Sequence, residues 1–167
     1  MRNNLLTVCL LVFAQVLVCN YLSLSPYLTL SILPVILFAL PTKYGTVATL
    51  FIAFAMGLAV DFMAEGWLGL NIVALLPVAA LKRALCEALF GDEIIEREES
   101  FSFEKYGLGK IIFGIIVCQA LFLFIYVWAD GSSAYPLSFS ATRWLVSSVA
   151  GVLVSIPLAN MITKEDR

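Results

Sequence analysis

The chain contains no histidine. This absence removes the side chain most often used for proton transfer near pH 7, and with it every His-based metal site. It also excludes Ser-His-Asp and Cys-His nucleophile pairs. The histidine-dependent routes to hydrolytic and metal-assisted catalysis are therefore closed to this sequence.

Charged residues are scarce as well. They make up 13% of the 167 residues, whereas 62% are hydrophobic; soluble domains average about 25% charged and roughly 45–50% apolar. This composition predicts an all-α polytopic membrane protein, with residues 1–167 forming one small domain embedded in the lipid bilayer. The net charge of −2 and the lack of a basic run argue against binding to nucleic acid.

The four cysteines follow no metal-binding spacing. We interpret Cys9, Cys19, Cys86 and Cys118 as small apolar core residues without a disulfide framework, and we expect no metal or cofactor. The segment that ends at Cys19 also resembles a lipoprotein signal peptide. However, Val18 stands where cleavage prefers a small residue and the remainder of the chain is itself apolar, so we predict an uncleaved first helix.

Six apolar spans can be placed, which predicts a single bundle of six transmembrane helices. Pro26 and Pro41 agree with the boundaries, because proline disfavours helix in the residue before it. The first two spans are short for a membrane core roughly 30 Å thick. The spans cover residues 5–18, 27–40, 45–64, 67–81, 111–129 and 141–162.

The distribution of lysine and arginine predicts the orientation. With the N-terminus in the cytoplasm, Arg143 is the only basic residue on the outer side. The positive-inside rule then favours both termini in the cytoplasm. The residues placed inside are Arg2, Lys43, Lys82, Arg83, Arg97, Lys105, Lys110, Lys164 and Arg167.

The only long connection, residues 82–110, is then cytoplasmic. Its first part, KRALCEALF, alternates charged and apolar residues at helical spacing and should extend the fourth helix by a turn or two. The following acidic part, within 91–105, is either a solvated loop or a docking site for a cytoplasmic partner.

Asp61 is the most informative residue, because it lies within the apolar run 45–64. A carboxylate at the centre of a bilayer costs about 2.5–3.5 kcal/mol. Small residues precede it at every fourth position, which is typical of a helix that packs closely on another protein helix. That helix belongs either to the same bundle or to a partner. The stripe comprises Gly45, Thr49, Ala53, Gly57 and Asp61.

The alternative for Asp61 is that it lies near the end of the helix and reaches water. At about 1.5 Å per residue, its position places it near the outer interface. Arg143 opens the sixth span at the same depth, so we predict an ion pair between Asp61 and Arg143.

The sequence offers little for enzymatic chemistry. An intramembrane aspartyl protease needs two carboxylates that share a site, and Asp130 falls in an outer loop away from Asp61. No GxSG-type serine element or Walker glycine loop is present. A single carboxylate could serve proton-coupled transport, although the spans lack the several polar residues that usually line a pathway. We expect a non-enzymatic protein.

The segment GLAVDFMAEGWLGLNIVALLPVAALKR resembles the core signature of the MreD family, the rod shape-determining membrane proteins of bacteria. The similarity covers about 30 residues, and chain length and the six-span layout agree with it. The matching positions are Gly57, Asp61, Gly66, Leu68, Gly69 and Asn71.

The resemblance implies a scaffold of the cell-elongation complex in the bacterial inner (cytoplasmic) membrane, which regulates cell shape and peptidoglycan synthesis. It implies as partners MreC, the actin-like filament MreB, and the elongation glycosyltransferase and transpeptidase. The family's bundle is similar to the substrate-binding subunits of energy-coupling-factor vitamin transporters, which supplies an alternative function. Those subunits carry an Ala-xxx-Ala face on their first helix, and the span LLTVCLLVFAQVLVC has none.

Overall fold

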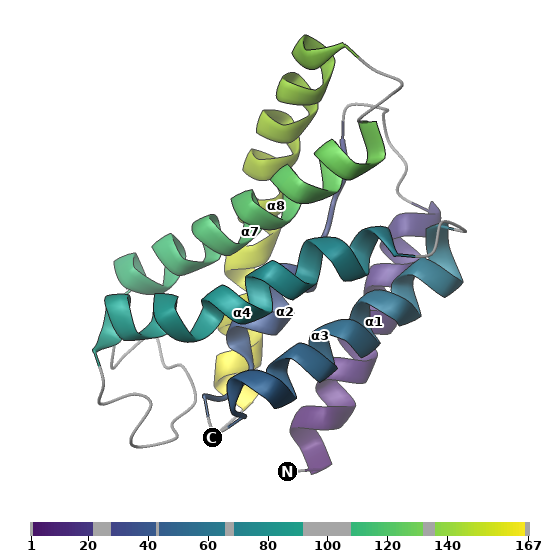
Figure 1. The fold of residues 1–167 in the computed structure, drawn as a ribbon. Helices are drawn as coiled ribbons and strands as arrows, with labels where there is room; N and C mark the ends of the chain where they lie inside the picture. The colour runs from purple at the N-terminus through teal and green to yellow at the C-terminus, as the bar shows by residue number, and fades with distance from the viewer. Residues whose placement is uncertain are drawn as a thin grey trace.

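The computed structural model describes residues 2–21, 28–42, 44–65, 69–91, 108–131 and 136–165; most of these are helical and none forms a strand (Figure 1). Six α-helices and one π-helical turn, η1, make up the described part of the chain. Their bounds are α1 Arg2–Tyr21, α2 Leu33–Ala39, α3 Thr46–Val60, η1 Asp61–Glu65, α4 Leu70–Phe90, α7 Leu108–Gly131 and α8 Leu137–Glu165.

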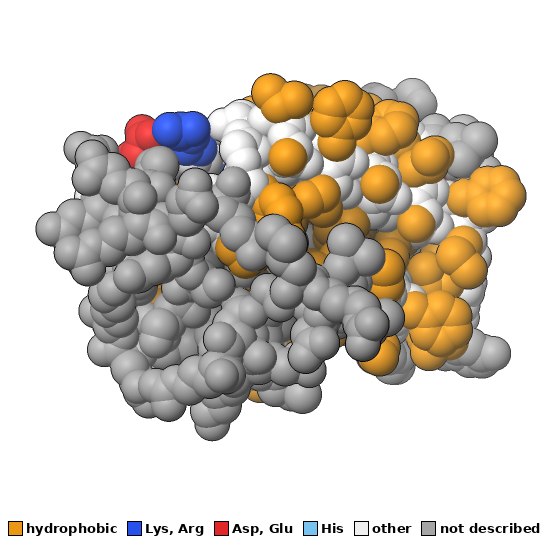
Figure 2. All heavy atoms as spheres, turned by 90° about the horizontal axis from the view of Figure 1, so that it is seen from below, with side chains coloured by type: hydrophobic (Ala, Val, Ile, Leu, Met, Phe, Trp, Pro, Cys, Tyr) orange, Lys and Arg blue, Asp and Glu red, His pale blue; other side chains and the backbone are white. Residues whose placement is uncertain are grey.

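Three of the described helices are long and apolar enough to cross a membrane. They are Thr46–Ala64, Gly109–Asp130 and Ser138–Leu158, and a shorter apolar helix covers Val8–Asn20. Large apolar side chains remain exposed on them, including Phe51 at 71% and Phe62 at 77%. Figure 2 shows apolar side chains spread over one broad face. This surface suits a lipid environment, and the chain is therefore a helical membrane protein.

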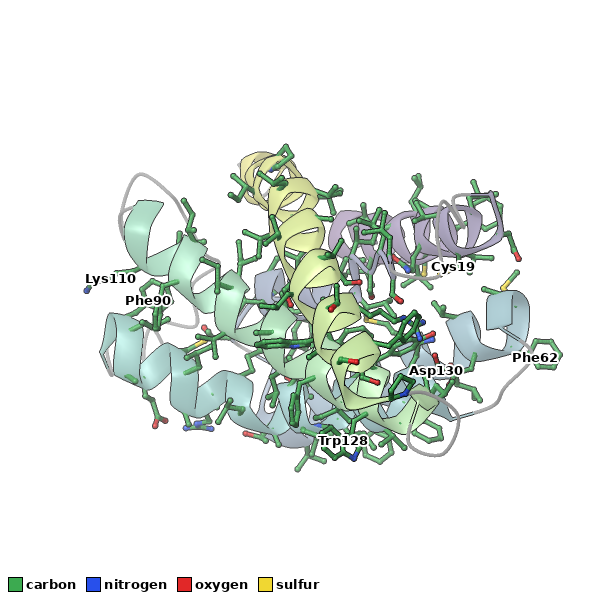
Figure 3. The ribbon with its side chains drawn as sticks, turned by 90° about the horizontal axis from the view of Figure 1, so that it is seen from above. Cys19, Phe62, Phe90, Lys110, Trp128 and Asp130 are labelled. Atoms are coloured by element: carbon green, nitrogen blue, oxygen red, sulfur yellow. The ribbon has the colours of Figure 1, made fainter. Side chains whose placement is uncertain are left out.

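The helices run back and forth between two ends of the bundle. In Figure 1, α1 and α3 begin at the lower side, where α8 ends. Figure 3 shows Phe90 and Lys110 at one end of the molecule, with Cys19 and Phe62 at the other. The course of the chain is compatible with successive crossings of a bilayer.

The short helix α2 forms the centre of the core. All of its residues, Leu33–Ala39, are buried. Phe38 packs where α7 has Gly114: a Cβ added at Gly114 would lie 2.5 Å from the Phe38 ring. From α1, Val16 joins the same core, so the N-terminal helix is part of the bundle.

The second span differs from the helix that we predicted over 27–40. Of the described residues 28–40, only 33–39 are helical, and 28–32 are non-helical although Ser31 and Ile32 are buried. Pro34, in the first turn of α2, is compatible with a helix that starts only here. Side-chain hydrogen bonds supply the physical reason. Gln15 and Gln119 bind the Leu30 and Ser31 carbonyls and the Ile32 N–H, backbone groups that a helix would satisfy internally.

Helix α4 confirms the predicted extension beyond the fourth span. It continues through KRALCEALF to Phe90 and ends at Gly91, which has φ +80° and donates its N–H to the Glu87 carbonyl at 2.9 Å. The acidic residues 92–105 lie outside the described residues, so their interpretation stays a prediction.

Candidate functional site

Asp61 lies at the corner between α3 and α4 and is fully buried, with 0% of its surface exposed. Its carboxylate accepts four hydrogen bonds, all from the start of α4. Oδ2 accepts from the backbone nitrogens of Gly69 at 2.9 Å and Ile72 at 3.4 Å. Oδ1 accepts from the backbone nitrogen of Asn71 at 3.0 Å and from its side-chain Nδ2 at 2.9 Å.

The start of α4 provides the electrostatic environment of this carboxylate. The first N–H groups of a helix lack internal partners and carry the positive end of the helix dipole, which favours an anion. Gly69, which precedes α4, has φ +113°, a backbone conformation that residues other than glycine rarely adopt. Asp61 therefore caps α4 from a different helix.

The predicted ion pair between Asp61 and Arg143 is wrong. Arg143 donates from Nη1 to Asp130, at the end of α7, and from Nε to Thr29 Oγ1 at 3.0 Å. Asp61 satisfies its carboxylate with the hydrogen bonds of α4 instead. Its full burial also contradicts the alternative that it reaches water.

The stripe of small residues on α3 faces the inside of the bundle. Thr49, Ala53 and Gly57 are buried, as is Asp61. Gly45 is exposed at the start of α3, and a Cβ added there would meet no atom within 4 Å. The prediction of close packing thus applies to the buried members of the stripe.

Gly57 marks the closest approach of α3 to α4. A Cβ added at Gly57 would lie 2.8 Å from the backbone nitrogen of Ile72 and 2.9 Å from its Cα. Because these are backbone atoms, no rotamer change could make room. At Gly57 the stripe therefore packs against a helix of the same bundle, and not against a partner.

Four of the six positions that carry the resemblance to the MreD family therefore have a structural explanation. Gly57 permits close packing, Asp61 caps α4, Gly69 supplies the left-handed turn, and Asn71 donates to the carboxylate. Gly66 and Leu68 lie outside the described residues.

A second polar site surrounds the non-helical residues 28–32. Gln15 of α1 accepts the Ile32 backbone N–H at 2.8 Å through Oε1 and donates from Nε2 to the Leu30 carbonyl at 3.2 Å. A backbone outside a helix needs such partners, because lipid offers no hydrogen bonds. Gln15 is buried and supplies both a donor and an acceptor.

Helices α7 and α8 hold the same residues from the other side. Gln119 donates from Nε2 to the Ser31 carbonyl at 3.0 Å, and the Thr29 N–H donates to Ser147 Oγ at 2.9 Å. Gly151 makes this possible, since a Cβ there would collide with the amide of Gln119. We call Gln15, Gln119 and Ser147 the polar clamp.

The polar clamp was missed in the sequence because its members are uncharged and far apart in the chain. The available signal was the occurrence of a glutamine in each of two apolar spans, together with the short second span. Two buried atoms of this region, Ser31 Oγ and Gln119 Oε1, have no hydrogen-bond partner among the described residues.

The cysteines occupy mixed environments. Cys86 and Cys118 are buried as predicted and Cys19 is half-buried, but Cys9 is exposed, so the prediction of a core position is wrong for Cys9. No disulfide joins the four cysteines. Within the described residues, no group of three metal-ligating side chains comes together.

Comparisons with known proteins add no relative: no family model, curated protein or solved structure matches this chain.

Proposed function

We propose that this protein is a non-enzymatic membrane scaffold of the bacterial cell-elongation complex, of the MreD type. The observation that supports the proposal is the use of the buried Asp61: its carboxylate binds the start of α4. An acid whose oxygens accept hydrogen bonds from three backbone N–H groups and one side-chain amide serves architecture better than proton transfer.

The proposed partners are MreC, MreB and the elongation glycosyltransferase and transpeptidase, which follow from the motif resemblance. The proposed location is the inner membrane, with both termini in the cytoplasm, and rests on the bias of lysine and arginine along the chain. A reporter fused after Arg167 should then report a cytoplasmic position and one inserted at Ser132 an external position. Opposite signals at either site would overturn the six-span topology.

Affinity purification of the tagged protein from mild detergent tests the function. Recovery of wall-elongation proteins would support the scaffold. Recovery of an ATPase with a coupling subunit would instead identify a transporter subunit.

A further inference from the structure

Three buried polar atoms lie where the start of α2 meets α7 and α8, and none of them has a hydrogen-bond partner among the described residues. They are Ser31 Oγ, Gln119 Oε1 and Ser155 Oγ. The three residues are buried, with at most 3% of their surface exposed. A fourth such atom, Ser148 Oγ, belongs to a residue that is only partly buried. An unpaired buried donor or acceptor is costly, so these atoms require an explanation.

Hydrogen bonds show how the segment that precedes α2 passes along α8. The Thr29 N–H donates to Ser147 Oγ. Two residues later, the Ser31 carbonyl accepts from the amide of Gln119, which packs against Gly151. Because Gly151 follows Ser147 by four residues, the segment advances along α8 by about one helical turn.

Ser155 lies one further turn along the same face of α8. Residues 147, 151 and 155 are spaced by four and all are buried, so this face is directed into the bundle. Beyond Ser31 the chain enters α2, which also contacts α8. The Ser155 hydroxyl therefore lies on the side of Gln119 toward which the chain continues. The three unpartnered atoms belong to one junction, formed by the start of α2, α7 and α8.

The donors and acceptors at this junction suit a small neutral ligand. Gln119 uses Nε2 for the Ser31 carbonyl, so its Oε1 remains as an acceptor, whereas each serine hydroxyl can both donate and accept. A water molecule offers two donors and two acceptors and can therefore bind all three atoms. A metal cation would engage oxygen lone pairs only, and none of the three groups is a carboxylate that would offset its charge in a low-dielectric interior.

We propose that Ser31, Gln119 and Ser155 bind one buried water molecule between the start of α2, α7 and α8. Buried waters typically make about three hydrogen bonds, which is the number that these atoms provide. The water acts together with the polar clamp: it completes the hydrogen bonding where α2 begins inside the bundle, since lipid offers no partners there. The site does not depend on the proposed scaffold function.

A crystal structure of the full chain, at a resolution that shows ordered water, tests the site directly. We expect one density peak about 2.6–3.2 Å from at least two of the three oxygens. A direct hydrogen bond between Ser31 Oγ and Gln119 Oε1, with no peak at the junction, would overturn the proposal. A peak surrounded by five or more oxygens at shorter distances would identify a cation and would overturn it as well.

A stability cycle in detergent tests whether the two hydroxyls share a ligand. Ser31→Ala and Ser155→Ala should each lower the melting temperature by about 2–4 °C, because each removes a hydrogen bond to the water. The double variant should depart from the sum of the two shifts by about 2 °C or more, because groups that bind the same water are coupled.

Ser138→Ala is the matched control, since it makes the same substitution at an exposed position of α8. Combined with Ser31→Ala, it should give additive shifts. Additive shifts for Ser31→Ala with Ser155→Ala would mean that each hydroxyl is satisfied separately, as in a serine that donates to the carbonyl four residues before it, and would overturn the shared water. A rise in melting temperature in Ser155→Ala would also overturn it, because a hydroxyl without a partner gives that result. If a variant fails to accumulate, the density peak in the unaltered protein decides.

Discussion

One carboxylate oxygen of Asp61 holds both the backbone and the side-chain amide of Asn71, ten residues further along the chain. This double contact fixes where α4 starts relative to the end of α3. Each donor is buried or nearly so, and removal of the acceptor leaves several unsatisfied groups.

Replacement of Asp61 is therefore expected to destabilise the bundle. Asp61→Ala should cost about 3 kcal/mol, because buried N–H groups lose their acceptor and water cannot replace it. Asp61→Asn keeps one acceptor oxygen and should have an intermediate effect. Thermal unfolding in mild detergent measures both. Asp130→Asn, whose side chain is partly exposed, should change stability by about 1 kcal/mol or less.

Gly57 should tolerate no added methyl group. Gly57→Ala places a Cβ against the Ile72 backbone and forces α3 and α4 apart, at a cost of about 1–3 kcal/mol. Gly45→Ala is the matched control, since a Cβ at Gly45 meets nothing within 4 Å. Membrane abundance and melting temperature are the measurements. Similar values for the two variants would contradict the close approach.

The separate partners of Asp61 and Arg143 predict how double substitutions behave. In a stability cycle, Asp61→Asn and Arg143→Gln should be additive within about 0.5 kcal/mol, because they share no contact. Asp130→Asn with Arg143→Gln should show coupling of about 0.2–1 kcal/mol, typical of a partly exposed pair. Coupling confined to the first pair would show that Asp61 and Arg143 do meet.

The polar clamp predicts an unusual relation between Gly151 and Gln119. Gly151→Ala should displace the Gln119 amide and release the Ser31 carbonyl, with a cost of about 1–3 kcal/mol. Gln119→Ala removes the amide that the new methyl group would strike.

Adding Gly151→Ala to Gln119→Ala should therefore cost little more than Gln119→Ala alone. Gly109→Ala, at an open position of α7, is the control for the loss of a helical glycine. Full additivity of Gly151→Ala and Gln119→Ala would mean that the methyl group acts elsewhere.

Asp61 could be recognised from sequence because a charge in an apolar run stands out. Its partners could not. Depth along a helix places Arg143 at a similar level but says nothing about the side it faces, and the true donors are backbone N–H groups, which every residue except proline carries. Sequence therefore identified the residue and misassigned its contact.

The prediction of a helix over the second span, 27–40, was wrong for a related reason. Hydropathy reports that 27–40 is apolar, and both a helix and a buried non-helical segment satisfy that. The conformation depends on Gln15 and Gln119, which supply hydrogen bonds from distant helices. Long spans such as Gly109–Asp130 were predicted well because their length and hydropathy admit few alternatives.

The hydrogen bond between Thr29 and Ser147 joins residues 118 positions apart in the chain. At synthesis rates of roughly 5–20 residues per second, Ser147 is made between about 6 and 24 seconds after Thr29. During that interval the backbone at Thr29 lacks its final partner. The hydrogen bonding of residues 28–32 is therefore completed only after α8 has been synthesised, although these residues are among the first to be translated.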